Sequence, residues 1–197
     1  MFLGLGLILF QGMNPILASA IMPGWGEWIL QKKNEARTFF IIEGTLWTSY
    51  YTFNYFGVKL EKSSRIFAFE HAGANPLRKD KEYFDNLEDF NSSDEYNLLI
   101  EHEASQYYPD DPVRQQEYIK ENGYFGEDSW EWDALDNRNI YWERRKAARE
   151  NLRRASFITG FLIINRLVSV VNVAIFKQES GFGLEVEPGK LGIGLRF

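Results

Sequence analysis

One segment of the chain is long and apolar enough that it has to be buried, either against other parts of the protein or in a lipid bilayer. Ser156 to Phe176 reads SFITGFLIINRLVSVVNVAIF, close to the roughly 20 residues that a helix needs to cross a bilayer. Just before it, seven basic and two acidic residues lie between Arg138 and Arg154. Basic residues beside an apolar run are typical of a membrane-proximal helix. The sequence therefore predicts one long helix over Trp132–Lys177 with an apolar second half.

A second apolar segment, Thr38 to Val58, is crowded with aromatic residues and carries Glu43 as its one charge. Trp and Tyr favour the interfaces of a bilayer, and Trp47 and Tyr55 fit that pattern. The segment reads either as a partly interfacial membrane helix or as the core helix of a soluble bundle. We predict the membrane helix.

The first residues, Met1 to Met22, include no charged side chain. They read as a signal peptide with a cleavage-like Ala18 to Ala20, or as a retained membrane helix that ends at Pro23. A third alternative places the true start upstream, with the first apolar residues as the remnant of a signal sequence. We predict a retained segment from about Asn14 onward and leave Met1 to Gly12 open.

The segment PGWGEW, at Pro23 to Trp28, is predicted to be a turn. Pro23 ends the preceding helix, and Gly24 and Gly26 permit the change of direction. The segment lacks the Lys and Ser/Thr of a P-loop and follows an apolar helix rather than a strand. Phosphate binding at this turn is therefore not expected.

Two opposite charges lie inside the apolar segments, Glu43 in Thr38 to Val58 and Arg166 in Ser156 to Phe176. An isolated charge is costly in such a place and is usually paired or functional. We predict that the two meet between helices as a structural clasp, with an ion or proton path as the alternative. Asn165 and Asn172 are expected to hydrogen-bond between helices in the same way.

Between the two apolar segments lies a polar, acidic insert, residues 59–137. From Asp80 to Asp136 it has eighteen acidic residues against three basic ones, yet it is too rich in Tyr, Phe and Leu to be simply disordered. The basic run Arg144 to Arg154 is expected to meet either this insert or anionic lipid headgroups. The predicted helices of the insert are Leu60–His71, Lys79–Phe90, Ser93–Ser105 and Pro112–Asn122, and short polar residues mark the start of the last two.

The C-terminal residues form a different pattern. Pro188-Gly189 suits a type II turn, and the apolar residues from Leu191 to Phe197 alternate with Gly and Arg. Alternation with a period of two is typical of a strand. The sequence predicts a C-terminal β-hairpin.

Signals for chemistry are weak. The chain has no cysteine, which excludes disulfides and thiolate sites, and its net charge of −6 argues against a nucleic-acid binder. His71 and His102 lie near Glu residues, but neither has the spacing of a zinc helix. We predict no catalytic residue, no metal site and no cofactor.

Three segments together resemble a known pattern: SAIMPGWGEW, IIEGTLWTSYY, and the Arg-rich helix that runs into an apolar segment from Arg144 to Asn172. They are similar to an uncharacterised bacterial envelope family, a domain of unknown function with a Ser-x-x-x-Pro-Gly-x-Gly-Gln element. That element falls on Ser19, Pro23, Gly24 and Gly26, and Glu27 replaces the usual Gln. The resemblance implies an envelope location, a Pro-Gly element within the mature protein, and no established activity.

The predicted fold is mainly α: two or three apolar membrane-associated helices, an acidic helical insert and a C-terminal β-hairpin. The predicted divisions are residues 1–58, 59–137, 138–177 and 178–197. The predicted function is a structural or accessory, non-enzymatic protein of the bacterial cell envelope, in its inner or outer membrane. Its expected partners are membrane lipid and other envelope proteins or a larger complex, but no nucleic acid. The alternatives are a small channel or transporter component that uses Glu43 and Arg166, and a soluble periplasmic enzyme or binding protein with an acidic site.

Overall fold

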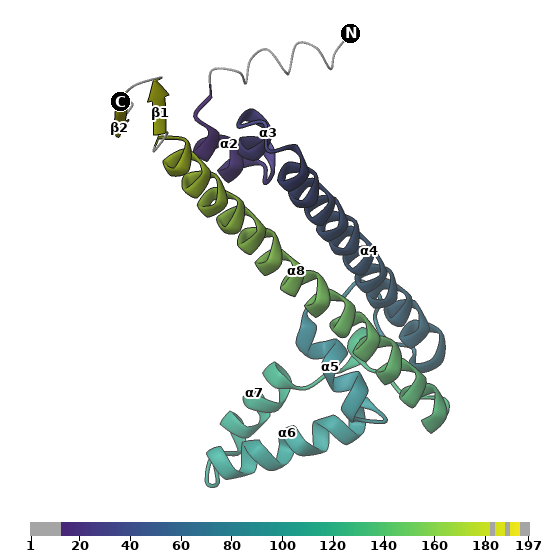
Figure 1. The fold of residues 1–197 in the computed structure, drawn as a ribbon. Helices are drawn as coiled ribbons and strands as arrows, with labels where there is room; N and C mark the ends of the chain where they lie inside the picture. The colour runs from purple at the N-terminus through teal and green to yellow at the C-terminus, as the bar shows by residue number, and fades with distance from the viewer. Residues whose placement is uncertain (1–12, 182–183, 188–189, 194–197) are drawn as a thin grey trace. The chain divides into compact units, whose positions relative to one another are not determined.

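The computed structural model describes residues 13–181, 184–187 and 190–193. It is mainly helical, as the sequence predicts, and the chain divides into two units (Figure 1). The first unit is Met1–Phe53 with Arg154–Phe197, and the second unit is Asn54–Arg153. The helices are α2 (Pro15–Ile21), α3 (Trp25–Ile29), α4 (Lys33–Ala72), α5 (Lys81–Asp89), α6 (Ser93–Tyr107), α7 (Pro112–Asn122), the short 3-10 helix η1 (Gly126–Asp128) and α8 (Leu135–Gly181).

The two units divide after Phe53 and after Arg153, whereas the predicted divisions lie after residues 58 and 137; all four places lie inside α4 or α8. Residue 58 lies inside α4, which continues through the predicted separate helix Leu60–His71, and residue 137 lies inside α8. A change from apolar to polar side chains alters what a helix packs against. It does not interrupt the backbone hydrogen bonds, because no Pro stands at either place.

Polar side chains cap the starts of three shorter helices, as predicted for α6 and α7, whereas α5 begins at Lys81 and not at the predicted Lys79. The side chains of Asp80, Ser92 and Asp111 accept hydrogen bonds from backbone N–H groups in the first turns of α5, α6 and α7. These bonds satisfy donors that have no partner within the helix. Local sequence therefore fixes where these three helices start.

The C-terminal strands β1 (Leu184–Glu187) and β2 (Lys190–Ile193) pair in antiparallel fashion, with Leu184 opposite Ile193 and Glu187 opposite Lys190. The predicted turn at residues 188–189 and the last residues, 194–197, lie outside the described part of the chain. The complete hairpin therefore stays a prediction.

Within the first unit, α4 and the second half of α8 run antiparallel. Glu43 of α4 contacts Arg166 of α8, and ten residues further along α4 the ring of Phe53 contacts Arg154, twelve residues back along α8. Buried residues recur on α8 at intervals of three or four, which is the spacing of one helix face. They are Ala155, Ile158, Leu162, Asn165, Ser169 and Val173.

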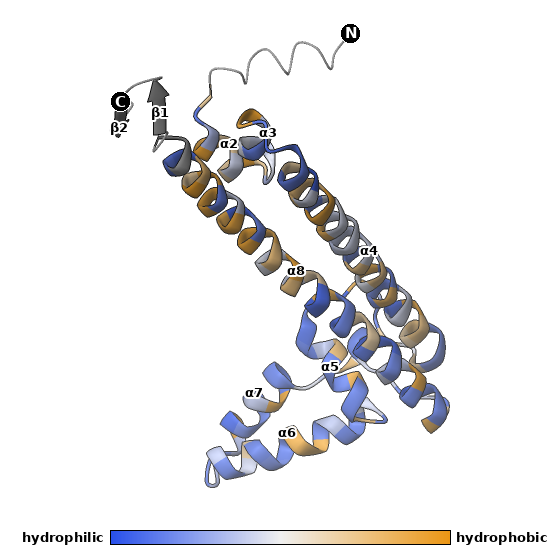
Figure 2. Cartoon of the chain, in the orientation of Figure 1, coloured by the Kyte–Doolittle hydropathy of each residue, from blue (hydrophilic) through white to orange (hydrophobic). Residues whose placement is uncertain are grey.

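One helix among the described residues is long and apolar enough to cross a membrane, judged by length and composition, and it is α8. Figure 2 shows its hydrophobic half. The segment Thr38 to Val58 of α4 does not reach the same mean hydropathy, because its Trp, Tyr, Thr and Ser residues score low on a hydropathy scale. The predicted second membrane helix is thus less apolar than the first.

The second unit has its own core, which is unusually aromatic. Tyr83, Leu87 and Tyr141 are fully buried in it, and Trp130 and Trp132 pack around them. The polar atoms of these rings are bonded: the Trp132 indole donates to the Leu87 carbonyl, and the Tyr141 hydroxyl donates to the Phe84 carbonyl. Burial raises the pKa of Tyr141 to about 12, so it remains a donor at neutral pH. Trp142 lies outside this core and is 39% exposed.

Ion pairs join part of the basic run to the acidic insert. Arg145 lies 2.6 Å from Asp85 and 2.8 Å from Glu88, and Arg149 also binds Glu88. Of the two partners proposed for the basic run, the chain's own insert is therefore the one that Arg145 and Arg149 contact. Because both acids lie on α5, the pairs fix α5 against α8 within the second unit.

We expect Asp80→Asn to reduce the acid sensitivity of the second unit. Hydrogen bonds from Arg78 lower the pKa of the Asp80 carboxyl. Such a group contributes stability above the pKa of an unfolded Asp, about 4, and this stability is lost as pH falls through the lower pKa of the folded state. Asn still caps α5 but carries no charge. An acid titration followed by near-UV circular dichroism should show a shallower loss below about pH 4 than in the control Asp110→Asn.

Candidate functional site

The most distinctive feature of the first unit is a line of buried and partly buried polar side chains along one face of α8. Asn165, Ser169 and Asn172 are spaced by four and three residues, so they project from the same face. They meet polar residues of α2, α3 and α4. We call this group the polar seam; it comprises Ser19, Glu27, Glu43, Asn165, Arg166, Ser169 and Asn172.

At one end of the seam, the Glu27 carboxylate is completely buried. It accepts hydrogen bonds from the Ser19 hydroxyl at 3.0 Å and the Asn172 amide at 3.2 Å. The Ser169 hydroxyl lies 3.0 and 2.9 Å from its two oxygens. Since all three partners are donors, the arrangement suits an acceptor-only group such as an ionised carboxylate.

The two hydroxyls that face Glu27 also bind the Pro-Gly turn. The Gly24 N–H donates to Ser169 Oγ at 3.0 Å, and the Gly26 N–H donates to Ser19 Oγ at 3.1 Å. Each hydroxyl therefore accepts from the turn and donates to Glu27. Hydrogen bonds linked in this way polarise and strengthen one another in a dry environment. The turn, α2 and α8 are thus joined through one carboxylate.

The two glycines of the turn have different roles. Gly24 has a φ of 92°, the left-handed region that favours glycine, and it precedes α3. Gly26 lies within α3 and does not make the turn, contrary to the prediction. Its role is close packing, because a Cβ there would collide with the Pro15 carbonyl, the Ser19 hydroxyl and Val173. Pro23 is buried beside them.

We expect Gly26→Ala to lower the free energy of unfolding by about 2 kcal/mol, since overfilling a packed site forces the backbone apart. The matched control is Gly44→Ala. A Cβ at Gly44 meets nothing within 4 Å, and Ala favours a helix over Gly, so this variant should be neutral or slightly stabilised. Thermal unfolding in detergent measures both. Equal melting temperatures would contradict the packing role of Gly26.

At the other end of the seam, Glu43 is 5% exposed and meets a cation. Its carboxylate lies 2.7 Å from an Arg166 nitrogen and accepts hydrogen bonds at 3.0 Å from both Trp47 and Asn165. Arg166 also donates to the Leu162 carbonyl. The structure therefore brings together Glu43, Arg166 and Asn165, which the sequence predicts to meet. Asn172 also bonds across helices, as predicted, and its partner is Glu27 of α3.

Three members of the seam are not predicted from the sequence: Ser19, Glu27 and Ser169. In the sequence, Glu27 is notable only as a replacement for Gln in a motif. A signal for Ser169 was present, because it lies on the helix face that carries Asn165 and Asn172. The partners of Glu27 are up to 145 residues away along the chain, so the pattern of neighbouring residues in the sequence does not predict these contacts.

The two histidines do not share a site. His71 Nδ1 lies 2.9 Å from Asp133, whereas His102 contacts Gln106 one turn along its own helix. Within residues 13–181, 184–187 and 190–193, no group of three or more His, Asp or Glu residues has a metal-binding arrangement. The donors of the polar seam bind the carboxylates of Glu27 and Glu43, so their hydrogen bonds hold helices together.

The chain was also compared with known proteins. No family model, no curated protein and no solved structure matches it. The polar seam and the aromatic second unit are therefore the observations on which a function has to be argued.

Proposed function

We propose that the chain is a membrane-anchored accessory protein of the bacterial envelope, in which the first unit is the anchor and the second unit is a folded acidic platform for other proteins. The observation that carries this proposal is the outer surface of the apolar half of α8. Eight large apolar side chains there are each at least half exposed: Phe157, Phe161, Ile163, Ile164, Leu167, Val168, Val171 and Ile175. An apolar surface of this extent is costly in water and suits a lipid surrounding.

The arrangement of α8 differs from that in a soluble core helix. Its inner face carries Asn165, Ser169 and Asn172 among buried apolar residues, and its outer face is apolar. In a bilayer the apolar side chains gain nothing by burial between helices, whereas buried polar groups hold helices together. The polar seam would thus be the attachment between α8, α4 and the Pro-Gly turn.

Helix α4 has a further feature that suits a lipid surrounding. Four exposed threonines donate their hydroxyl hydrogens to carbonyls one turn earlier in the helix: Thr38, Thr45, Thr48 and Thr52. A hydroxyl that binds its own helix needs no water. This explains how a segment of modest hydropathy can accompany α8 in a membrane.

Fractionation of cells that carry the full chain tests the proposal. We expect the protein to remain with the membranes after an alkaline carbonate wash, and N-terminal sequencing should find Ser19 retained, because cleavage after Ala20 would remove a donor to Glu27. Release into the soluble fraction would contradict the proposal. It would instead favour a soluble periplasmic enzyme or binding protein with an acidic site.

A second candidate function, part of an ion or proton path, is favoured by one observation. Among the described residues, no cation lies within ion-pair distance of Glu27, so its carboxylate is buried with uncharged donors alone. Ionisable groups in such places often line conduction paths. Conductance in reconstituted bilayers that is lost in Glu27→Gln or Arg166→Gln would support this candidate.

A further inference from the structure

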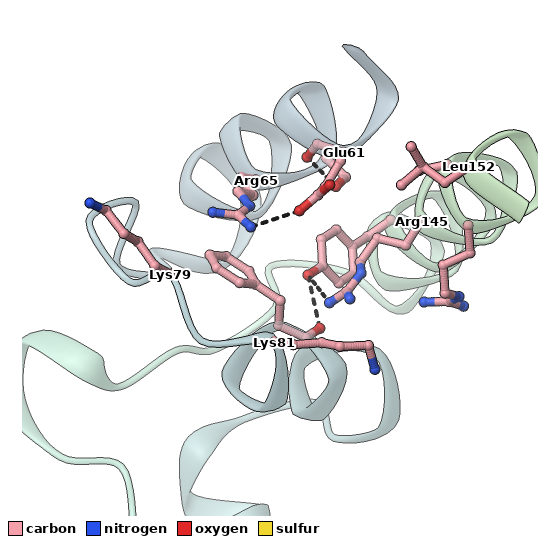
Figure 3. Close-up of a pocket in the computed structure, with 11 residues that line it drawn as sticks. Glu61, Arg65, Lys79, Lys81, Arg145 and Leu152 are labelled. Carbon is pink, nitrogen blue, oxygen red and sulfur yellow. Dashed lines mark hydrogen bonds and ion pairs between the residues drawn. The ribbon is translucent and has the colours of Figure 1, made fainter. Parts of the chain in front are cut away.

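A pocket of about 250 Å³ lies within the second unit, between α4, α5 and α8 (Figure 3). Five of its eleven lining residues are basic: Arg65, Lys79, Lys81, Arg145 and Arg149. This is unexpected in the second unit, which has twenty-two acidic and fourteen basic residues, a net charge of −8. More than a third of the basic residues of an acidic unit therefore surround one cavity.

The acids near the pocket do not neutralise these cations fully. Asp85 is shared by Lys81 and Arg145, and Glu88 is shared by Arg145 and Arg149. Two carboxylates thus serve three cations. The Arg145 side chain is 9% exposed, so its position is fixed by the fold rather than by chance at the surface.

The opposite side of the pocket adds another unmatched charge. Arg65 pairs with Glu61 and lies over the Phe84 ring, whereas no ion pair joins Lys79 to an acidic side chain in the part of the chain that the structure describes. Figure 3 shows Arg65 and Lys79 on one side of the pocket and Arg145 on the other. With Glu61, Asp85 and Glu88 counted, the five cations leave a net charge of +2 around the cavity.

The remaining lining is apolar. Phe84, Ala148 and Leu152 contribute to the wall, and Leu152 lies four residues, about one helical turn, before Ser156, where the apolar half of α8 begins. A ligand that fits such a wall carries a negative group and an apolar part. Basic side chains immediately before a membrane-crossing segment lie at the depth of the lipid headgroups.

We propose that this pocket binds the phosphate headgroup of an anionic phospholipid. The proposal rests on the proposed membrane anchoring of α8, because that anchoring brings Leu152 to headgroup depth. The phosphate oxygens would accept hydrogen bonds from Lys79 and Lys81, and the first carbons of the lipid would lie against Phe84 and Leu152. Lys and Arg both bind phosphate oxygens strongly as charge-assisted donors.

The test is a binding titration with the full chain in an uncharged detergent. The probes are dihexanoyl phosphatidic acid, dihexanoyl phosphatidylcholine and inorganic phosphate, and isothermal calorimetry gives each affinity. We expect saturable binding of the phosphatidic acid and a loss of about tenfold in Lys79→Gln/Lys81→Gln, from two cations removed. Arg145 is left unchanged because its ion pairs hold α5 to α8.

The matched control is Lys62→Gln/Lys120→Gln, which removes two exposed lysines that do not line the pocket, and its affinity should stay within twofold. Equal affinity for inorganic phosphate would overturn the assignment to a lipid. Absence of binding, or equal binding by the two double variants, would overturn the site itself. Binding in detergent does not require α8 to cross a bilayer. A negative binding titration is therefore distinct from release of the protein in the carbonate wash, which would contradict the proposed membrane anchoring.

Discussion

Glu27→Ala is expected to lower the free energy of unfolding by about 3 kcal/mol, because it removes the acceptor at the centre of the polar seam. The Ser19 and Ser169 hydroxyls and the Asn172 amide would lose their shared partner inside the protein. Each buried polar group left without a partner costs about 1–3 kcal/mol, and the lost side chain leaves a cavity as well. Equilibrium unfolding in mixed micelles, followed by near-UV circular dichroism, measures the change.

Glu27→Gln is the matched control for that variant. Gln keeps the volume and one acceptor oxygen, but an NH2 group replaces the other acceptor. We expect it to lose about 1–2 kcal/mol, less than the Ala variant, because one acceptor oxygen and the packing remain. If Gln lost as much as Ala, the charge of Glu27 and not its acceptor oxygens would hold the seam, and the account of this end of the seam would be wrong.

Arg166→Gln is expected to cost about 2 kcal/mol. Removal of one partner from a buried ion pair strands the other charge, which costs about 3–5 kcal/mol when both partners are fully buried. Arg166 is 29% exposed, so solvent reduces the effect. Glu43 also keeps its hydrogen bonds from Trp47 and Asn165.

A double-mutant cycle with Glu43→Gln isolates the contribution of the pair. The combined variant should lose less than the sum of the two single losses, because no charge is then stranded. The charge-swapped variant, Glu43→Arg with Arg166→Glu, should recover part of the stability but not all, since Trp47 and Asn165 would face a cation. Strict additivity together with no recovery in the swapped variant would disprove the pairing.

Several parts of the fold can be predicted from local sequence, because local forces decide them. Ser92 and Asp111 cap helices where short polar residues precede a helical pattern, and Gly24 takes the positive φ that the Pro-Gly turn suggests. The pairing of Glu43 with Arg166 is predictable as well, because two opposite charges in apolar helices have few other partners.

Other parts depend on contacts that no local pattern records. The continuity of α4 through residue 58 was missed because a change in polarity was interpreted as a boundary between segments. Glu27 was overlooked because its burial results from packing of α2 and α8 around it. The packing role of Gly26 has the same origin, since Pro15 and Val173 approach it only in the folded chain.

Spin labels at single cysteines give the most direct test of whether the first unit lies in a membrane. The natural chain has no cysteine, so each introduced one is unique. Leu167 and Val171 are 59% and 57% exposed, whereas Leu162 and Val173 are 5% and 0% exposed. In reconstituted membranes, labels at the first two positions should be accessible to oxygen, which concentrates in lipid, and shielded from a water-soluble nickel complex. Labels at the last two should be shielded from both. Access of the nickel complex to Leu167 and Val171 would place this face of α8 in water and contradict the membrane anchor.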